Sequence, residues 1–335
     1  MNILVCYGTR PELIKINPLI KEFRRQNIEF KLLCVKQHTS LIMDAKEADY
    51  TVDVPEATNR LDGLLAVPMA IPKEVFEGIT HVLVQGDTAT ALVCSLAAFH
   101  RNIKVIHLEA GLRTYDTQNP YPEETYRQII SRVASIHLCP TEENAMNLKR
   151  EGIVDGVFVV GNTGLDNIIE LREKTEINNE VLVTLHRREN HSIMDQWFTE
   201  INKIALNHPE YIFILPIHPN PNVQKHRHLL SKVKVIEPLP YDQFIDRVSR
   251  CALIISDSGG IQEEASFLGK NVIVCRQITE RPESVGISSF LCQSPEELFS
   301  TFELTIKNRP PEKSNLYGDG HTSKKISKYL LKSKK

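Results

Sequence analysis

The fold of this chain is decided by the stretch Ser256-Asp-Ser-Gly-Gly-Ile-Gln-Glu-Glu-Ala-Ser-Phe-Leu-Gly269. The four residues before it, Ala-Leu-Ile-Ile at 252–255, form a short apolar run that is typical of a buried strand. After Gly260 the apolar residues recur at helical spacing, and Gly269 is a typical helix stop. The stretch therefore predicts a strand, a turn of small residues at 258–260 and a helix.

A turn of this kind can bind an anion, because glycines let backbone N–H groups approach a ligand at a helix N-terminus. Glu263 and Glu264 are expected in the first turn of the helix, where a carboxylate would repel a phosphate but could accept hydrogen bonds from ribose hydroxyls. The stretch is therefore interpreted as a cradle for a nucleotide diphosphate. An ordinary strand–turn–helix joint without a ligand has the same local pattern, and the pattern alone leaves both readings open.

Length and composition narrow the class of protein. The 335 residues are enough for two domains, each with its own core. A net charge of −2 gives no reason to expect nucleic acid or a membrane as a partner. The seven cysteines are scattered without metal-ligand spacing, which indicates reduced, buried thiols and no metal site. With no apolar run of membrane-spanning length and no signal-peptide pattern, we expect a soluble cytoplasmic protein.

Strands and helices alternate along the whole chain. Helices are expected from Pro11, after Val75, at 91–100 and at 123–134, and one at the C-terminus should dock on the body with its lysines in solvent. The polar run 172–180 is the linker candidate, after a helix that begins near Leu165. Alternation of this kind predicts parallel βαβ units. Strands are expected at 3–7, 30–35, 81–84, 104–108, 137–139, 157–160, 181–185, 211–215, 234–236, 253–255 and 271–274.

Most of the unusual polar residues come directly after predicted strands. In an open parallel sheet this edge is where ligands bind, and two such sheets facing each other would surround one cleft. A single carboxylate at such a place is more often a helix cap or a turn residue, but here the pattern recurs at strand after strand. The residues are Arg10, Gln37, His38, Asp87, Glu109, His186, His218 and Ser258.

Several motifs in fixed order resemble those of the bacterial non-hydrolysing UDP-N-acetylglucosamine 2-epimerases over essentially the whole chain. The resemblance implies a GT-B-like α/β architecture of two Rossmann-type domains, with parallel sheets facing across a deep cleft. The domains would be 1–165 and 166–320, with a terminal helix at 321–335 that joins the first. Besides the stretch at 256–264, the motifs are Gly8-Thr-Arg-Pro-Glu12 with Ile14-Lys15, Gln85-Gly-Asp-Thr88, His107-Leu-Glu-Ala-Gly-Leu-Arg-Thr114, Pro122-Glu-Glu124 with Arg127, Gly161-Asn-Thr163, His186-Arg-Arg-Glu189, Glu280-Arg-Pro-Glu283 and Tyr317-Gly-Asp-Gly320.

The resemblance also implies an activity, the interconversion of UDP-N-acetylglucosamine and UDP-N-acetylmannosamine by a homodimer with no metal and no redox cofactor, for bacterial surface polysaccharide precursors. The C2 proton of the sugar is not next to a carbonyl carbon, so direct carbanion formation is implausible. Loss of UDP from C1 would first make the C2 hydrogen removable and give a glycal. Reprotonation on the other face and return of UDP would complete the inversion, which requires acid–base groups and a water-excluding cleft.

Site residues follow from the motifs that match. As catalytic groups the resemblance implies Asp87, Glu109, Glu123 and His186. As groups that bind the UDP-sugar it implies Arg10, Lys15, Arg127, Ser258, Gly259, Gly260 and Glu264.

Structural roles are the alternatives for several of these positions. The pair Glu123 and Glu124 could be only the acidic start of a helix, and Arg113 and Arg127 could be ion-pair partners. His218 could simply end its strand. His107, inside an apolar strand, is interpreted as a core histidine rather than a catalyst.

The sequence departs from the family pattern at a regulatory site. Bacterial members bind a second UDP-N-acetylglucosamine as an activator through a Gln-His motif that has a further Gln three residues after the first. Here Gln37 and His38 are present but Ser40 occupies the place of the further Gln, while Arg60, Arg187 and His218 could match other parts of the site. Regulation is therefore left open, and so is the sugar, because relatives act on UDP-2,3-diacetamido-sugar uronic acids.

Three other readings share part of the pattern. A GT-B glycosyltransferase would have the same fold and UDP cradle, and a hydrolysing epimerase would release free sugar and UDP. The motifs at 8–12 and 107–111 favour the non-hydrolysing branch. A non-catalytic nucleotide-sugar sensor would not need Asp87, Glu109 and Glu123, so the presence of all three disfavours it.

Overall fold

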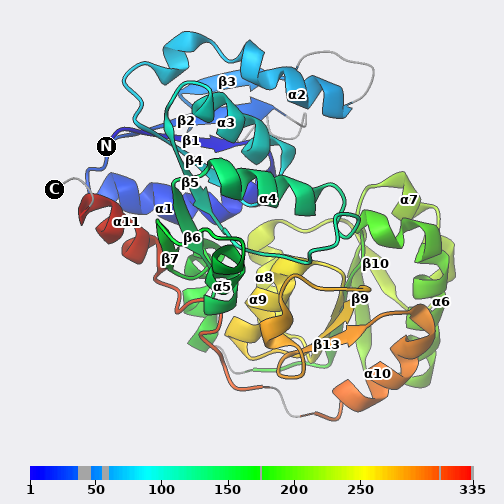
Figure 1. Ribbon diagram of the computed structural model, residues 1–335. Coiled ribbons are helices and arrows are strands. Elements are labelled where there is room, and N and C mark those ends of the chain that lie inside the picture. The colour runs from blue at the N-terminus through cyan, green and yellow to red at the C-terminus, as the bar shows by residue number, and fades with distance from the viewer. Residues whose placement is uncertain (37–46, 55–59, 174–175, 309–310, 333–335) are drawn as a thin grey trace. The chain divides into compact units, whose positions relative to one another are not determined.

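The computed structural model describes the chain except for residues 37–46, 55–59, 174–175, 309–310 and 333–335 (Figure 1). The chain divides into two compact units. The N-terminal unit comprises Met1–Asn167 and Gly318–Lys335, and the C-terminal unit comprises Ile168–Tyr317. No helix in the described part of the chain is long and apolar enough to cross a membrane.

The N-terminal unit is built on a sheet of seven strands, all parallel, in the order β3-β2-β1-β4-β5-β6-β7. Its central strands are apolar and buried almost throughout, as expected for a parallel sheet that helices cover on both faces. The strands are β1 (Ile3–Tyr7), β2 (Phe30–Lys36), β3 (Tyr50–Asp53), β4 (His81–Gln85), β5 (Lys104–Leu108), β6 (Ile136–Cys139) and β7 (Val157–Val159).

Helices cover the two faces of this sheet in separate cores. On one face, α1 (Arg10–Arg25) and α11 (Thr322–Lys332) lie side by side, blue and red in Figure 1. Phe23 of α1 and Ile326 and Leu330 of α11 share a core there, so the predicted docking of the terminal helix on the body is confirmed. The other face carries α2 (Arg60–Ala70), α3 (Ala89–Phe99) and α4 (Glu123–Val133), while α5 (Glu142–Arg150) packs beside β6 and β7.

The C-terminal unit contains a second sheet, of six parallel strands in the order β10-β9-β8-β11-β12-β13. The prediction of an α/β protein with two parallel sheets is therefore confirmed. The strands are β8 (Glu180–Thr184), β9 (Ile212–Pro216), β10 (Lys234–Ile236), β11 (Leu253–Ser256), β12 (Val272–Cys275) and β13 (Ser289–Cys292).

Two helix layers sandwich this sheet as well. Trp197 and Phe302 lie at the centre of the core under α6 (Met194–Asn207) and α10 (Leu298–Thr305). The opposite face is covered by α8 (Tyr241–Arg250) and α9 (Gly259–Leu268), which contact each other, and α7 (Pro221–Gln224) follows β9. Gly269 ends α9 with a left-handed φ of +68°, the conformation that glycine adopts without strain.

Several sequence predictions differ from the structure. The helix expected after Val75 is wrong, because Lys73–Phe76 is a 3₁₀ helix and a turn follows it up to β4. The α-helix in this part of the chain is α2, which ends before the 3₁₀ helix begins. Strands β3 and β13 were not predicted, since each is short and lies at an edge of its sheet. The helix expected near Leu165 is a pair of 3₁₀ helices, Thr163–Asn167 and Ile169–Glu173, and the linker candidate at 172–180 lies inside the C-terminal unit.

The strand orders locate the place in each unit where a ligand is expected. In the first sheet the order reverses between β1 and β4, and in the second between β8 and β11. Crevices at such topological switch points, at the carboxyl ends of the strands, are where open α/β sheets bind ligands. The segments that leave these four strands carry Arg10, Asp87, His186 and Ser258, so the predicted site residues lie at both switch points.

Candidate active site

At the switch point of the N-terminal unit, one buried carboxylate joins the two loops that carry Arg10 and Asp87. Glu12 is 1% exposed, and its Oε2 accepts hydrogen bonds from Gly8 N (3.1 Å) and Thr9 Oγ1 (2.7 Å). Its Oε1 accepts from Thr88 Oγ1 (2.7 Å), the residue after Asp87. Burial raises the pKa of Glu12, although the three donors lower it.

Asp87 lies in an ion pair. Its Oδ2 is 2.5 Å from Nη2 of Arg127, which projects from α4 and is 3% exposed. Glu124 Oε2 lies 3.3 Å from Nη1 of the same guanidinium. The Asp87 side chain is still 28% exposed, so the ion pair does not bury it. The ion-pair alternative for Arg127 is thus correct and compatible with a place in the site.

Glu109 is held in an unusual backbone conformation. It comes directly after β5 with φ +66°, a left-handed value that residues with a side chain rarely adopt. Lys15 Nζ lies 2.8 Å and 2.6 Å from its two oxygens, and Gln85 Nε2 donates to Oε2 as well. The side chain is 6% exposed. Strained, over-determined residues of this kind cluster at functional sites.

The two acidic residues at the start of α4, Glu123 and Glu124, differ in burial and in contacts. Glu124 is fully buried, and its carboxylate accepts the backbone N–H groups of Thr114 and Tyr115, each at 3.1 Å. The structural alternative is therefore correct for Glu124. Glu123 is only half-buried, and remains the candidate for chemistry.

His107 is a core histidine, as interpreted from the sequence. It is 0% exposed and its Nε2 donates to the Gly86 carbonyl at 2.8 Å. Burial lowers the pKa of His107 to about 3, so the ring is neutral at physiological pH. A neutral ring in this position fixes the turn that precedes Asp87.

In the C-terminal unit, the cradle at 258–260 contains two glycines with different roles. A Cβ on Gly259 would lie 2.4 Å from Nη1 of the buried Arg281, so this glycine is required by packing. A Cβ on Gly260 would meet no atom within 4 Å. The backbone at Gly260 is therefore open, as a cradle at the N-terminus of α9 requires.

The two glutamates after the cradle differ from the prediction. Helix α9 begins at Gly259, so Glu263 and Glu264 lie beyond its first turn. Glu263 is buried and paired with Arg281 Nε at 2.5 Å, which makes it structural. Glu264 is half-buried and accepts a hydrogen bond from the Tyr241 hydroxyl at 2.9 Å.

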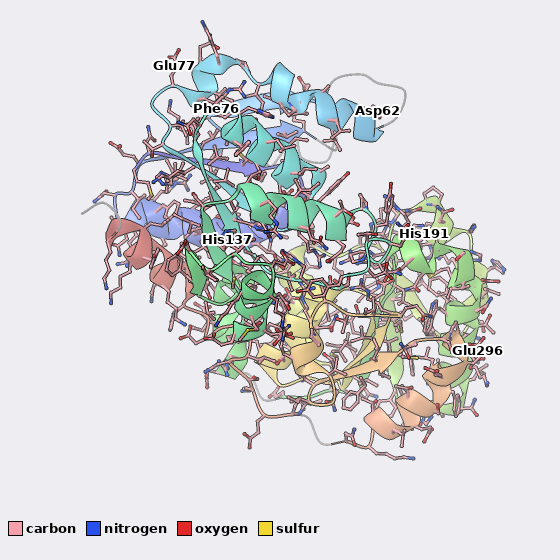
Figure 2. The ribbon with its side chains drawn as sticks, in the orientation of Figure 1. Asp62, Phe76, Glu77, His137, His191 and Glu296 are labelled. Carbon is pink, nitrogen blue, oxygen red and sulfur yellow. The ribbon has the colours of Figure 1, made fainter. Side chains whose placement is uncertain are left out.

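The His186 loop lies beside the cradle, because β8 and β11 are neighbouring strands in register at Thr184 and Ser256. The His186 ring stacks on the ring of His218, with centroids 5.2 Å apart. His191, labelled in Figure 2, donates from Nε2 to the His186 carbonyl at 3.1 Å. Burial lowers the pKa of His186 and of His218.

The predicted activator residues are only partly described. Gln37 lies outside the described residues, and Arg60 opens α2 but its side chain is not described. Arg187 follows His186, and its Nε is buried without a hydrogen-bond partner among the described residues. His218 is exposed and lies in the loop after β9, with Nδ1 accepting a hydrogen bond from Asn220 N at 3.1 Å. The activator site stays a prediction.

Three residues at these switch points were missed by the sequence reasoning. Glu12 and Gln85 lie inside motifs already quoted, and their contacts with Thr88 and Glu109 join segments far apart in the chain. Asp257 lies in the stretch 256–269, and the sequence feature that could have pointed to it is its place between Ser256 and Ser258. The structure shows it fully buried under the His186 loop.

Two doubly wound units with polar groups at both switch points define the class of nucleotide-handling α/β proteins. This chain belongs to the UDP-N-acetylglucosamine 2-epimerase family, whose model matches residues 24–331. It is 38% identical to the UDP-N-acetylglucosamine 2-epimerase of Campylobacter jejuni, over 99% of this chain and 98% of the relative.

Solved structures agree with this assignment. A crystal structure of UDP-GlcNAc 2-epimerase from Neisseria meningitidis bound to UDP-GlcNAc has a TM-score of 0.89 and 35% identity, covering 99% of this chain and 100% of that one. The Methanocaldococcus jannaschii UDP-GlcNAc 2-epimerase in complex with UDP-GlcNAc and UDP has a TM-score of 0.85 and 30% identity, with coverage of 99% and 100%.

Proposed function

We propose that this protein is an isomerase that interconverts UDP-N-acetylglucosamine and UDP-N-acetylmannosamine without hydrolysing them. The family and the relatives, which carry the name of this activity, support the proposal. The observation that carries it in this chain is Glu109, a carboxylate held in a left-handed conformation between Lys15 and Gln85 at the switch point. A sensor or a simple binding module has no need for a carboxylate fixed in this way.

The N-terminal unit supplies the acid–base groups of the proposed reaction. Asp87, Glu109 and Glu123 are the carboxylates that would remove the C2 proton after UDP leaves and return a proton on the other face. Arg127 and Lys15, each paired with one of them, hold two of these carboxylates in place. Arg10, exposed at the start of α1, is a cation available for the substrate.

The C-terminal unit supplies the nucleotide cradle. The open backbone at Gly260 suits a diphosphate at the start of α9, and His186 and Arg187 leave the neighbouring strand with donors for it. Dipoles and cations that stabilise departing UDP would lower the barrier to breaking the C1–O bond. Ser258 is the residue before α9 and its N–H is already bound to Ser256 Oγ at 2.9 Å, so its hydroxyl is the group that the cradle offers.

Solvent isotope incorporation tests this proposal. In D₂O, UDP-N-acetylmannosamine formed from UDP-N-acetylglucosamine is expected to carry deuterium at C2, with little free sugar. An ¹⁸O label in the C1–O–P bridge is expected to scramble into non-bridging positions of the β-phosphate, because the bond breaks and re-forms. NMR and mass spectrometry measure both. Epimerisation without deuterium at C2 would contradict elimination and re-addition.

The cradle gives a binding prediction. Glu264→Ala is expected to weaken UDP binding by about 1–3 kcal/mol, the cost of leaving ribose hydroxyls without a buried acceptor. Tyr241→Phe is the matched control, because it removes the phenol that donates to Glu264 but keeps the carboxylate, and its effect should be smaller. Calorimetry with UDP measures both. Unchanged affinity in Glu264→Ala would assign this residue a structural role only.

The same proposal includes a homodimer, a cytoplasmic location and a place in the supply of bacterial surface polysaccharide precursors, which rest on the resemblance to the family. It also includes an activator site. Since Ser40 is shorter than the glutamine of the family motif, this site is expected to respond weakly to UDP-N-acetylglucosamine.

A further inference from the structure

Asp257 is a fully buried carboxylate that the proposed reaction does not use. It is 0% exposed and lies between Ser256, the last residue of β11, and Ser258 of the cradle. Its backbone N–H donates to Thr184 O at 3.2 Å, which extends the pairing of β11 with β8 by one residue. Its side chain therefore leaves the sheet at the switch point, beside the loop that follows β8.

The carboxylate binds that loop through three neutral donors. Oδ2 accepts the backbone N–H groups of His186 (3.0 Å) and Arg187 (2.8 Å) and the side-chain amide of Asn190 (3.0 Å). Asn190 is itself anchored in the core, since its Oδ1 accepts from Trp197 Nε1 at 3.1 Å. Neutral donors satisfy the carboxylate but do not cancel its charge. A buried carboxylate that makes no ion pair within the described part of the chain is costly, which suggests a functional role for Asp257.

The ring of His186 is the group on which this charge acts. Burial is the largest influence and lowers the pKa of His186, whereas Asp257 raises it and Arg187 and His218 lower it. His218 faces the ring by stacking from the loop after β9, and His191 donates to the backbone carbonyl. Among these neighbours, Asp257 is the one that favours the protonated ring.

We propose that Asp257 is a positioning residue for His186: it fixes the backbone of the His186–Arg187 turn and so holds the imidazole beside the cradle for a nucleotide diphosphate. This inference rests on the proposed function, because it needs UDP in the cradle. The proton on His186 would add a charge-assisted hydrogen bond to the diphosphate. Asp257 acts only through His186 and touches no reacting atom.

The sign of the pH effect follows from this arrangement. Loss of the Asp257 charge removes the influence that raises the pKa of His186, so the ring of the variant loses its proton at a lower pH. The His186-dependent part of UDP affinity, which is present at low pH and lost as the ring deprotonates, must then disappear at a lower pH. The terminal phosphate of UDP titrates near pH 6 as well, and His186→Gln supplies the profile that contains this contribution without that of His186.

A double-mutant cycle tests the proposal. UDP affinity is measured by calorimetry from about pH 5.5 to about pH 8 for the wild type, Asp257→Asn, His186→Gln and the double variant. Asp257→Asn is expected to move the His186-dependent midpoint to lower pH, and to weaken UDP binding most strongly between the two midpoints. In the His186→Gln background the same change should cost much less.

Three outcomes would overturn the inference. A midpoint that Asp257→Asn leaves in place, or an equal loss of affinity in both backgrounds, would make Asp257 a structural residue only. Wild-type and His186→Gln profiles that coincide at every pH would also overturn it, and this comparison needs no folded Asp257 variant. Failure of the wild type to bind UDP at any pH would instead contradict the proposed function.

Discussion

Glu109→Gln is expected to lower the rate of epimerisation at least about 10²-fold, the usual scale for loss of a general acid or base. Glutamine keeps the size of the side chain and can still accept a hydrogen bond from Lys15, but it cannot take up or release the C2 proton. The epimerisation rates of Asp87→Asn and Glu123→Gln are expected to fall by a similar factor for the same reason. Turnover is measured by NMR with UDP-N-acetylglucosamine as the substrate, and UDP binding by calorimetry.

A neighbouring glutamate provides the control. Glu124→Gln changes the same functional group one residue from Glu123, but in a carboxylate that holds the backbone of Thr114 and Tyr115. Its main expected effect is a lower free energy of unfolding, because an amide cannot accept all of these N–H groups. A turnover near that of the wild type in Glu109→Gln, with UDP still bound, would remove Glu109 from the chemistry.

The sequence could predict the two parallel sheets because the strands are apolar runs separated by helices. The same logic placed Asp87, Glu109 and His186 at the carboxyl edges of their strands. The secondary-structure predictions were wrong where the local sequence pattern is weak. Edge strands β3 and β13 have only four residues each, and the helix expected after Val75 gave way to a 3₁₀ turn.

Contacts between segments that lie far apart in the chain could not be predicted from the sequence. The left-handed backbone of Glu109 depends on Lys15 and Gln85, which arrive from α1 and β4. The partners of Asp257 are backbone N–H groups, and these have no signature in the sequence at all. The ion pair of Glu263 with Arg281 also joins two separate segments, the cradle helix and the motif at 280–283, so the sequence could not predict it.

The C-terminal unit contains a buried ion network that links the cradle helix to the His186 loop. Arg281 Nε lies 2.5 Å from Glu263 Oε1, and its Nη1 lies 2.9 Å from Glu280 Oε1. Arg276 pairs with the other oxygen of Glu280 at 2.7 Å and with Glu189 at 2.7 Å. Both arginines are less than a twentieth exposed, at 4% and 1%. Solvent therefore screens these charges little, and each depends on its partners.

Arg281→Met is expected to lower the free energy of unfolding of the C-terminal unit by about 3–5 kcal/mol, the cost of leaving a buried charge unpaired. The change removes the cation beside Glu263, which is 1% exposed and cannot reach solvent. Trp197, the single tryptophan of the chain, lies in the core of the same unit, so its fluorescence during urea unfolding reports on this unit specifically. Circular dichroism follows both units, so a transition that it shows apart from the fluorescence transition belongs to the N-terminal unit and should change much less.

A change at Glu263, the partner of Arg281, shows whether the loss of stability comes from breaking the charge pair. Arg281→Met combined with Glu263→Gln removes both charges, and is expected to recover part of the stability that Arg281→Met loses. Lys307→Met breaks an exposed pair with Glu303 in the same unit, and should leave the urea midpoint close to that of the wild type. If Glu263→Gln lowered the free energy of unfolding by the same amount in the Arg281→Met background as in the wild type, the two residues would not be coupled. The network would then contribute through packing around Gly259, where a Cβ would meet the Arg281 guanidinium, rather than through charge.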